Sequence, residues 1–253
     1  MKLFHPDEIL YVVDKRQELH FNQVFRCARK TGLVEDDTKL SFLGFGTMNG
    51  KDGKPFKTRE GGVMRLENLI ADIDEEMFNK IVENRSVRDK DAKDTAKIVG
   101  LAAIKYGDLS NQATKDYIFD VDRFTSFEGN TGPYILYTIV RIKSILNRYV
   151  EAGGNLEAGE LLKASNGSEK NLMLQLSGFG SMIESAFEEK APHKICAYIY
   201  EVSNAFNSFY HETKILSEEN QAQKESYIRL LQLTKRVLET SIDLLGFEAP
   251  DKM

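Results

Sequence analysis

The spacing of hydrophobic residues along the chain changes near residue 64. Before that point, an apolar run over residues 9–13 lies between Pro6 and Asp14, which predicts a buried strand. A helical pattern follows and stops at Gly32, and a second strand is expected over residues 40–45. The apolar face of this helix consists of Phe21, Val24, Phe25 and Ala28. The order strand, helix, strand predicts a parallel α/β sheet.

After Arg65 the apolar residues recur at helical spacing. Such sets span residues 66–81, 98–106, 135–149, 172–187, 195–209 and 227–245. Glycines predict a mobile loop over 44–62 and a loop or broken helix over 151–170, and charged residues predict an exposed turn that enters a helix over 84–97. We therefore predict a mainly α protein, in which a helical bundle is preceded by a partial α/β piece.

The composition is that of an ordinary globular protein, with 42% hydrophobic and 29% charged residues. A net charge of -5 argues against nonspecific coating of nucleic acid, but it permits a local basic surface. Cys27 and Cys196 both lie in apolar helical patterns and are expected to be reduced, buried thiols. With no apolar run near the roughly 20 residues of a membrane span and no signal peptide, we expect a cytoplasmic protein.

Several common catalytic motifs are absent from the sequence. There is no GxxxxGK[ST] loop and no GxGxxG after a strand, which are the usual phosphate-binding motifs. The 4 histidines have no metal-ligand spacing, and no CxxC pair exists, so no metal site is expected. The residues by themselves therefore do not indicate a self-contained enzyme.

A glycine-rich loop over residues 50–59 is the first candidate for chemistry. It has four cations, namely Lys51, Lys54, Lys57 and Arg59. Lysines on such a loop suit an anionic ligand, because they can close over a polyphosphate and stabilise developing charge. On spacing alone, however, a soluble hairpin tip with surface lysines is the favoured interpretation.

The second candidate is the segment 126–134 with the helix behind it. Tyr134, Tyr137, Arg141 and Arg148 lie near one face at helical spacings. Arginine and tyrosine together suit contact with phosphates and exposed bases, since one base stacked on an aromatic ring is worth roughly 1–3 kcal/mol. A half-buried helix with arginines that extend to the solvent remains the alternative.

The third candidate is the segment 204–210. Phe206 and Phe209 continue the apolar face of their helix and are expected in the core. Tyr210 falls off that face and is expected to be exposed for stacking.

Together these segments resemble the arginyl-tRNA synthetases, a class I family. Residues 11–21 are similar to a late strand and helix of that catalytic domain, and residues 50–62 resemble its KMSKS loop, with Pro55-Phe56 for Met-Ser. Residues 126–137 are similar to the entry of its anticodon domain. Residues 204–210 and 244–253 resemble its last helices and C-terminus. The resemblance implies a Rossmann-like catalytic remnant over 1–63, a helical connecting region over 64–125, and a DALR-type anticodon-binding bundle over 126–253.

The resemblance also implies roles for residues in the first part. Lys54 and Lys57 take the places of the KMSKS lysines, and Lys57 would contact the phosphates of ATP while arginine attacks the α-phosphate. Gln17 resembles a residue that lines the arginine pocket, and His20 lies close by. The implied ligands are ATP, with Mg as its partner, and arginine.

In the second part the implied partner is the tRNA that accepts arginine. The positions that match the family's anticodon-binding residues are Tyr134, Tyr137, Arg141, Tyr210 and Met253. The family's HIGH motif is absent from the sequence, and a class I site needs both halves around one nucleotide. We therefore expect a piece of a longer enzyme that is monomeric and does not aminoacylate by itself.

Two other functions are consistent with these residues. A non-catalytic, synthetase-like interaction or regulatory module would keep the fold without tRNA binding, although it would have no reason to keep Lys54 and Lys57. Another class I synthetase, such as the cysteinyl type, is disfavoured by the absence of zinc-ligand cysteines.

Overall fold

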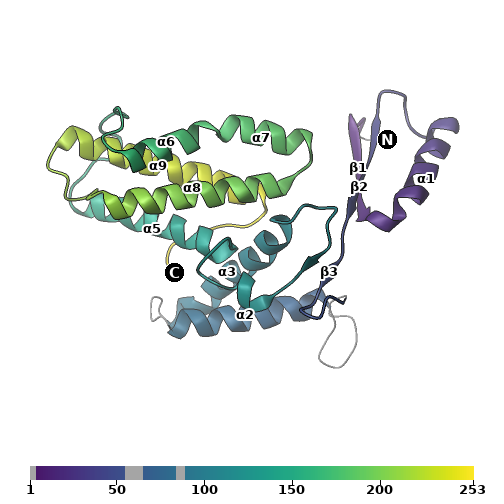
Figure 1. The fold of residues 1–253 in the computed structure, drawn as a ribbon, viewed down its shortest axis with the longest axis horizontal. Helices are drawn as coiled ribbons and strands as arrows, with labels where there is room; N and C mark the ends of the chain where they lie inside the picture. The colour runs from purple at the N-terminus through teal and green to yellow at the C-terminus, as the bar shows by residue number, and fades with distance from the viewer. Residues whose placement is uncertain (1–3, 55–64, 84–88) are drawn as a thin grey trace. The chain divides into compact units, whose positions relative to one another are not determined.

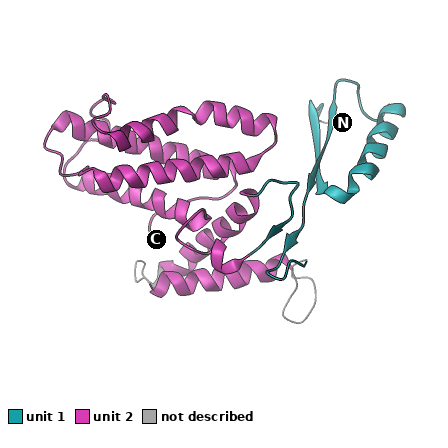
Figure 2. Ribbon diagram, in the orientation of Figure 1, with its two compact units in different colours: residues 1–63, 111–119 teal, residues 64–110, 120–253 magenta. Residues whose placement is uncertain are grey.

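The computed structural model describes residues 4–54, 65–83 and 89–253 of the chain (Figure 1). It divides into two compact units, which Figure 2 distinguishes by colour. Unit 1 consists of Met1–Val63 with Asn111–Phe119, and unit 2 consists of Met64–Ser110 with Asp120–Met253. A segment from the middle of the sequence therefore belongs to the N-terminal unit.

Unit 1 contains the predicted strand, helix and strand. Strand β1 (Glu8–Asp14) pairs in parallel with β2 (Lys39–Phe45), so that Tyr11 lies opposite Phe42. Helix α1 (Glu18–Lys30) packs on one face of this pair, where the Tyr11 ring lies 5.3 Å from Phe21 and 5.0 Å from Phe25 between centroids. The parallel arrangement predicted from the order of elements is confirmed.

The prediction of a buried strand over residues 9–13 is wrong for one of its faces. Leu10 and Val12 are 47% and 58% exposed. Successive side chains of a strand point to opposite faces, and α1 packs only on the face that carries Tyr11.

The loop expected over residues 44–62 contains a short strand that the sequence did not predict. Strand β3 (Met48–Asn49) pairs in parallel with β4 (Tyr117–Ile118), in register Met48 to Tyr117. The amide of Gly46 donates to the carbonyl of Ala113 at 2.8 Å just before this pair. Two-residue strands show no alternation, so the pattern of apolar residues gave no signal for them.

Unit 2 is a bundle of helices. Its long members are α2 (Leu66–Glu83), α3 (Asp89–Leu109), α5 (Gly132–Glu151), α8 (Pro192–Glu212) and α9 (Gln221–Leu244). The short ones are α4 (Val121–Phe124), α6 (Gly167–Ser177) and α7 (Phe179–Glu188). Helix α5 packs against α3, α8 and α9, and α8 also packs against α6 and α7. The mainly α fold is confirmed.

The start of α5 is fixed by three residues in sequence. The Thr131 hydroxyl accepts the amide of Tyr134 at 3.2 Å as an N-cap, and Pro133 occupies the first turn, where its missing N–H costs nothing. Gly132 lies so close to α3 that a Cβ placed on it would be 2.4 Å from the carbonyl oxygen of Ala102. Only glycine permits this approach of the two backbones.

The helix expected over residues 172–187 is in fact two helices. The chain breaks at Gly178, which ends α6 and precedes α7. Because the helical spacing restarts there, Ala186 rather than Phe187 is buried, and Phe187 is 82% exposed. Within 84–97, where a turn entering a helix was expected, α3 begins at Asp89, and residues 84–88 lie outside the described part of the chain.

One of the two expected buried thiols is exposed. Cys27 lies two positions after Phe25, roughly 200° around α1, and therefore points away from the sheet. Cys196 is buried in α8, and burial raises its pKa to about 12.

Candidate functional sites

An aromatic and arginine cluster lies where α5 and α8 meet in unit 2. We call Tyr134, Tyr137, Arg141, Asn204, Asn207 and Tyr210 the α5–α8 cluster. The guanidinium carbon of Arg141 lies 4.6 Å from the centroid of the Tyr137 ring and 5.2 Å from that of Tyr210. One arginine therefore contacts an aromatic ring from each of the two helices by cation–π attraction.

Hydrogen bonds join the polar ends of the cluster in a chain. Nη1 of Arg141 donates to Oδ1 of Asn207 at 2.7 Å, and Nδ2 of Asn207 donates to the Tyr134 hydroxyl at 2.8 Å. That hydroxyl donates in turn to Oδ1 of Asn204 at 2.8 Å. Partial burial raises the pKa of Tyr134, and this effect outweighs the bond from Asn207, which lowers the pKa. The hydroxyl therefore stays protonated at neutral pH.

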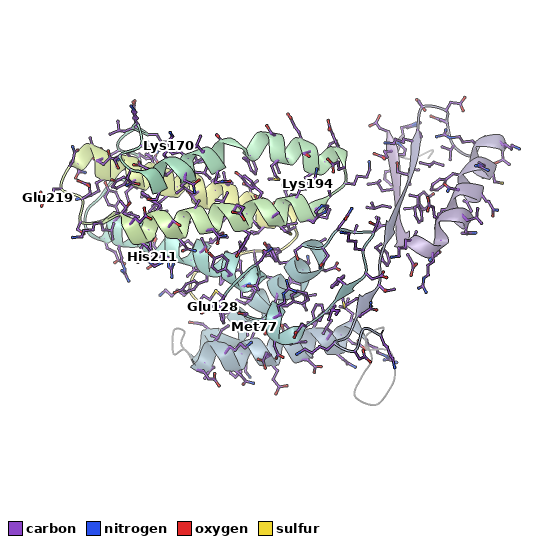
Figure 3. The ribbon with its side chains drawn as sticks, in the orientation of Figure 1. Met77, Glu128, Lys170, Lys194, His211 and Glu219 are labelled. Atoms are coloured by element: carbon purple, nitrogen blue, oxygen red, sulfur yellow. The ribbon has the colours of Figure 1, made fainter. Side chains whose placement is uncertain are left out.

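Two rings of the cluster face the solvent. Tyr137 is 40% and Tyr210 37% exposed. Tyr210 stacks on Phe206 with centroids 6.1 Å apart and an interplanar angle of 26°, and Phe206 itself is buried with Phe209. The expected core positions of the two phenylalanines and the expected exposure of Tyr210 are confirmed. Tyr210 lies at the C-terminal end of α8, next to His211, which is labelled in Figure 3.

The spacing of the residues explains why they meet. Tyr134, Tyr137 and Arg141 recur at three and four positions on α5, which places them on one face. Asn204, Asn207 and Tyr210 recur at three positions on α8. Arg148 lies two turns beyond Arg141 on α5 and is exposed, so it extends the same stripe.

Met253, the fifth residue predicted for this surface, follows a C-terminal segment that contacts α5. Nζ of Lys143 donates to the carbonyls of Ala249 and Pro250, both at 3.3 Å. Met253 itself is partly exposed. Within the described residues, no hydrogen bond or ring contact joins it to the α5–α8 cluster.

Asn204 and Asn207 are the members that sequence reasoning did not select. Asparagine is unfavourable inside a helix, because its amide competes with the backbone for hydrogen bonds. Two asparagines three residues apart within α8 were therefore a usable signal. Their partners, however, lie on another helix, and the sequence alone does not identify them.

The candidate residues of unit 1 lie at the start of α1 and in the turn after β3. Asp14 is the N-cap of the 3-10 helix η1 (Lys15–Gln17), and its carboxylate accepts a hydrogen bond from the amide of Arg16 at 2.8 Å. Gln17 ends this helix, and His20 follows on α1 with its ring 5.4 Å from that of Phe21. Both Gln17 and His20 are exposed.

Lys54 closes a tight turn. Its carbonyl accepts the amide of Gly50 at 2.8 Å, and its own amide donates to the carboxylate of Asp52 at 3.1 Å. In the stretches that the structure describes, no hydrogen bond or ion pair involves its ammonium group or joins it to Gln17 or His20. Lys57 lies outside the described residues.

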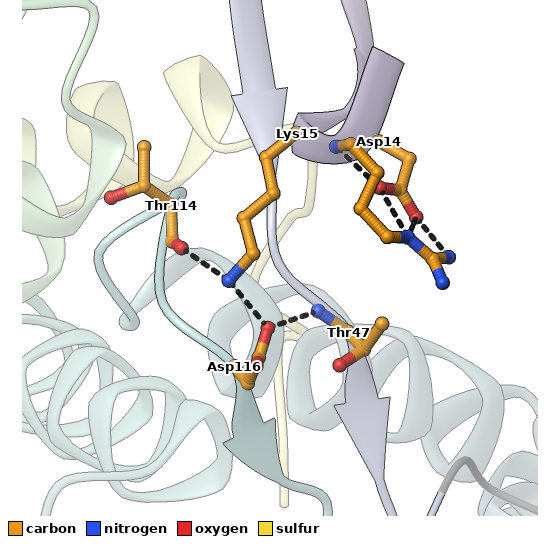
Figure 4. A network of polar contacts seen from close by, with 6 residues as sticks. Asp14, Lys15, Thr47, Thr114 and Asp116 are labelled. Carbon is orange, nitrogen blue, oxygen red and sulfur yellow. Dashed lines mark hydrogen bonds and ion pairs between the residues drawn. The ribbon is translucent and has the colours of Figure 1, made fainter. Parts of the chain in front are cut away.

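A polar network holds together three separate segments of unit 1 (Figure 4). Nζ of Lys15 lies 2.8 Å from a carboxylate oxygen of Asp116 and donates to the carbonyl of Thr114 at 3.1 Å. Asp116 also accepts the amide of Thr47 at 2.9 Å. The bond from Lys15, with the one from Thr47, lowers the pKa of Asp116 to about 2. The network thus connects the end of β1 to the strand that precedes Lys54.

Residues 4–54, 65–83 and 89–253 contain no group of three or more His, Cys, Asp or Glu side chains placed to hold a metal ion. None of the helices in this part of the chain combines the length and the apolarity needed to cross a bilayer.

Two family models match the chain and together span nearly all of it. The model described as "tRNA synthetases class I (R), catalytic domain" matches residues 1–121. The model described as "DALR anticodon binding domain" matches residues 135–253, which include all of α8 and most of α5.

Curated relatives and solved structures agree with the two models. The chain is 65% identical to the arginine–tRNA ligase of Agathobacter rectalis over its whole length, and 58% identical to that of Alkaliphilus oremlandii over 99% of it. It spans only 44% and 42% of these two relatives. It is also similar to the crystal structure of the Plasmodium falciparum arginyl-tRNA synthetase, with a TM-score of 0.80 at 26% identity, over 98% of this chain and 41% of that one.

Proposed function

Because the chain belongs to the arginyl-tRNA synthetase family, we propose that residues 126–253 bind the anticodon loop of the arginine tRNA through the α5–α8 cluster. The observation that carries this proposal is the position of Arg141 between two half-exposed tyrosines, Tyr137 and Tyr210. Unpaired bases of an RNA loop stack on aromatic rings and on guanidinium planes, and arginine N–H groups bind base edges and phosphates.

The cluster suits a single-stranded loop better than a duplex. Two exposed rings offer stacking surfaces, each worth roughly 1–3 kcal/mol per base. The bond from Nη1 of Arg141 to Asn207 leaves the Nε and Nη2 hydrogens for a ligand. Arg148, further along α5, adds a cation for a backbone phosphate, and Met253 is proposed to contact the same loop.

For the N-terminal part we propose a role in the reaction of the whole enzyme, the ATP-dependent attachment of arginine to its tRNA. Lys54 and Lys57 would contact the phosphates of ATP, and Gln17 with His20 would line the arginine pocket. The exposed ammonium of Lys54, on a tight turn, fits an anionic ligand. ATP supplies the activated α-phosphate, and Mg²⁺ is proposed to enter with its phosphates.

We also propose a monomeric, cytoplasmic protein. Cys27 and Cys196 are both free cysteines, which suits a reducing compartment. Gel filtration with light scattering would test the monomer, since a dimer would have twice the 28.7 kDa mass of the chain.

The proposed function is tested by a binding titration at fixed salt. The 253-residue chain is titrated with arginine tRNA and with a variant changed only at the middle base of the anticodon. At least about tenfold weaker binding of the variant, roughly 1.4 kcal/mol, is expected. Equal affinity for both tRNAs would contradict anticodon binding by this surface.

A second titration separates base contacts from charge-driven association. Nonspecific binding depends on phosphate neutralisation, with a salt slope of about -0.7 per phosphate on a single strand. A genuine anticodon site keeps its preference for the unchanged tRNA as salt rises, whereas charge-driven binding weakens equally for both. No tRNA binding at any salt would favour the alternative of an interaction or regulatory module.

A further inference from the structure

Asn207 is the one residue of the α5–α8 cluster that bonds to two of its tRNA-binding candidates at once. Its Oδ1 accepts from Arg141 and its Nδ2 donates to Tyr134, with distances of 2.7 and 2.8 Å. Asn207 is partly buried and comes from α8, whereas both partners come from α5. One amide therefore fixes two side chains of the opposite helix.

Arg141 sets the direction of each hydrogen bond in the series that runs from Arg141 through Asn207 and Tyr134 to Asn204. A guanidinium group only donates, so the oxygen of the Asn207 amide must face Arg141. The amide nitrogen must then face Tyr134, where it donates to the hydroxyl oxygen. The hydroxyl proton is directed to Oδ1 of Asn204, and the NH₂ group of Asn204 is left as a donor. The donor and acceptor pattern of the cluster is thus set before any ligand binds.

We propose that Asn207 is a positioning residue for anticodon recognition, which orients Arg141 and Tyr134 in the tRNA-free protein. The inference rests on the proposed function of the cluster. Arginine has one of the largest rotamer entropies, and a side chain that is already ordered loses less of it on binding. The two tyrosine rings restrain only the plane of the guanidinium, whereas the bond to Asn207 selects which edge points outward.

The experiment compares Asn207→Ala, which removes both bonds, with Asn207→Asp, which keeps an acceptor for Arg141 but has no donor for Tyr134 when ionised. The matched control is Ser208→Ala, at the next and exposed position of α8. Each variant is titrated with arginine tRNA and with the middle-base variant, and the ratio of the two Kd values is recorded. Far-UV circular dichroism shows whether each protein is folded.

We expect Asn207→Ala to reduce the ratio at least about fivefold while Ser208→Ala leaves it within about twofold. Asn207→Asp should give a ratio between these two, because it keeps the bond to Arg141 and loses the one to Tyr134. Its added charge weakens the binding of both tRNAs equally and therefore cancels in the ratio. Asn207→Ala should also have little further effect in a protein that already carries Arg141→Ala and Tyr134→Phe, since a positioning residue acts through those partners.

The outcomes separate the inference from the function on which it rests. If the unchanged chain binds both tRNAs equally, the proposed function fails. If the unchanged chain discriminates and Asn207→Ala keeps the same ratio, even with weaker binding overall, the positioning role is overturned and the proposed function stands. The positioning role is also overturned if adding Asn207→Ala to the variant that carries Arg141→Ala and Tyr134→Phe lowers the ratio of the two Kd values further.

Discussion

Lys15 and Asp116 are 101 residues apart in the sequence and form an ion pair of 2.8 Å within unit 1. Both side chains are about half exposed, so the charge pair by itself contributes little to stability. Asp116 gains importance from its second bond, since it also accepts the amide of Thr47 immediately before β3. One carboxylate therefore connects the end of β1 to the strand before the Lys54 turn.

Asp116→Ala is expected to loosen β3 and β4 without affecting the helices of unit 2. The variant removes the acceptor of the Thr47 amide, so the hydrogen exchange of that amide should become faster. Asp116→Asn is the matched control, because it removes the charge pair but keeps an acceptor oxygen. Equal exchange at Thr47 in the Ala variant and the unchanged protein would contradict this role.

The same carboxylate predicts a pH dependence of unit 1. The bonds from Lys15 and Thr47 hold the pKa of Asp116 at about 2, below its ordinary value of 3.8. A pKa that is lower in the folded state gives stability that is complete above the unfolded value, about pH 4, and is lost as the pH falls towards 2. Carboxyl NMR titration should give a midpoint near 2, which Lys15→Met should raise. An unchanged midpoint in Lys15→Met would refute the assignment of this shift to Lys15.

Gly132→Ala is expected to lower the free energy of unfolding of unit 2. The new methyl group would lie 2.4 Å from the Ala102 carbonyl oxygen, which is backbone and cannot rotate away. Such overpacking costs about 1–3 kcal/mol. Urea unfolding followed by the helical signal measures it. Gly180→Ala is the control, since a Cβ there meets nothing within 4 Å. This substitution should stabilise α7 by about 0.5–1 kcal/mol, because alanine loses less backbone entropy on folding than glycine.

Tyr210→Ala is expected to weaken tRNA binding roughly 5- to 150-fold, the equivalent of about 1–3 kcal/mol for one stacked base. Tyr210→Phe keeps the ring and should bind within about twofold of the unchanged chain. Phe187→Ala removes a ring that is 82% exposed on α7 and serves as a control. If Tyr210→Phe is as weak as Tyr210→Ala, the hydroxyl rather than stacking is responsible.

The helices of unit 2 were predictable because each buries one face at regular spacing. In α5, Ile135, Ile139 and Ile142 are all fully buried, as the pattern indicated. The spacing of apolar residues gave wrong predictions where an element does not bury one face at regular spacing. Helix α7 restarts the spacing after Gly178, so Phe187 was wrongly assigned to the core. Strands β3 and β4 were missed because they are too short to show a period.

The candidate site was predictable only as far as one helix at a time. Tyr134, Tyr137 and Arg141 were placed together by spacing on α5. Their contact with Tyr210 and Asn207 depends on how α8 packs against α5, which follows from side-chain shapes along both helices. The same holds for Lys15 and Asp116, whose partnership depends on a strand pairing that the sequence did not indicate.

The membership of Asn111–Phe119 in unit 1 has a consequence for how the two units can be exchanged between proteins. The chain passes between the units three times, so no single junction separates them. A transplant of the helical bundle that begins at residue 64 would bring Tyr117 and Asp116 without Met48 and Lys15, their partners in pairing and charge. Recombination, natural or engineered, therefore needs a second joint that replaces residues 111–119 with a short linker between α3 and α4.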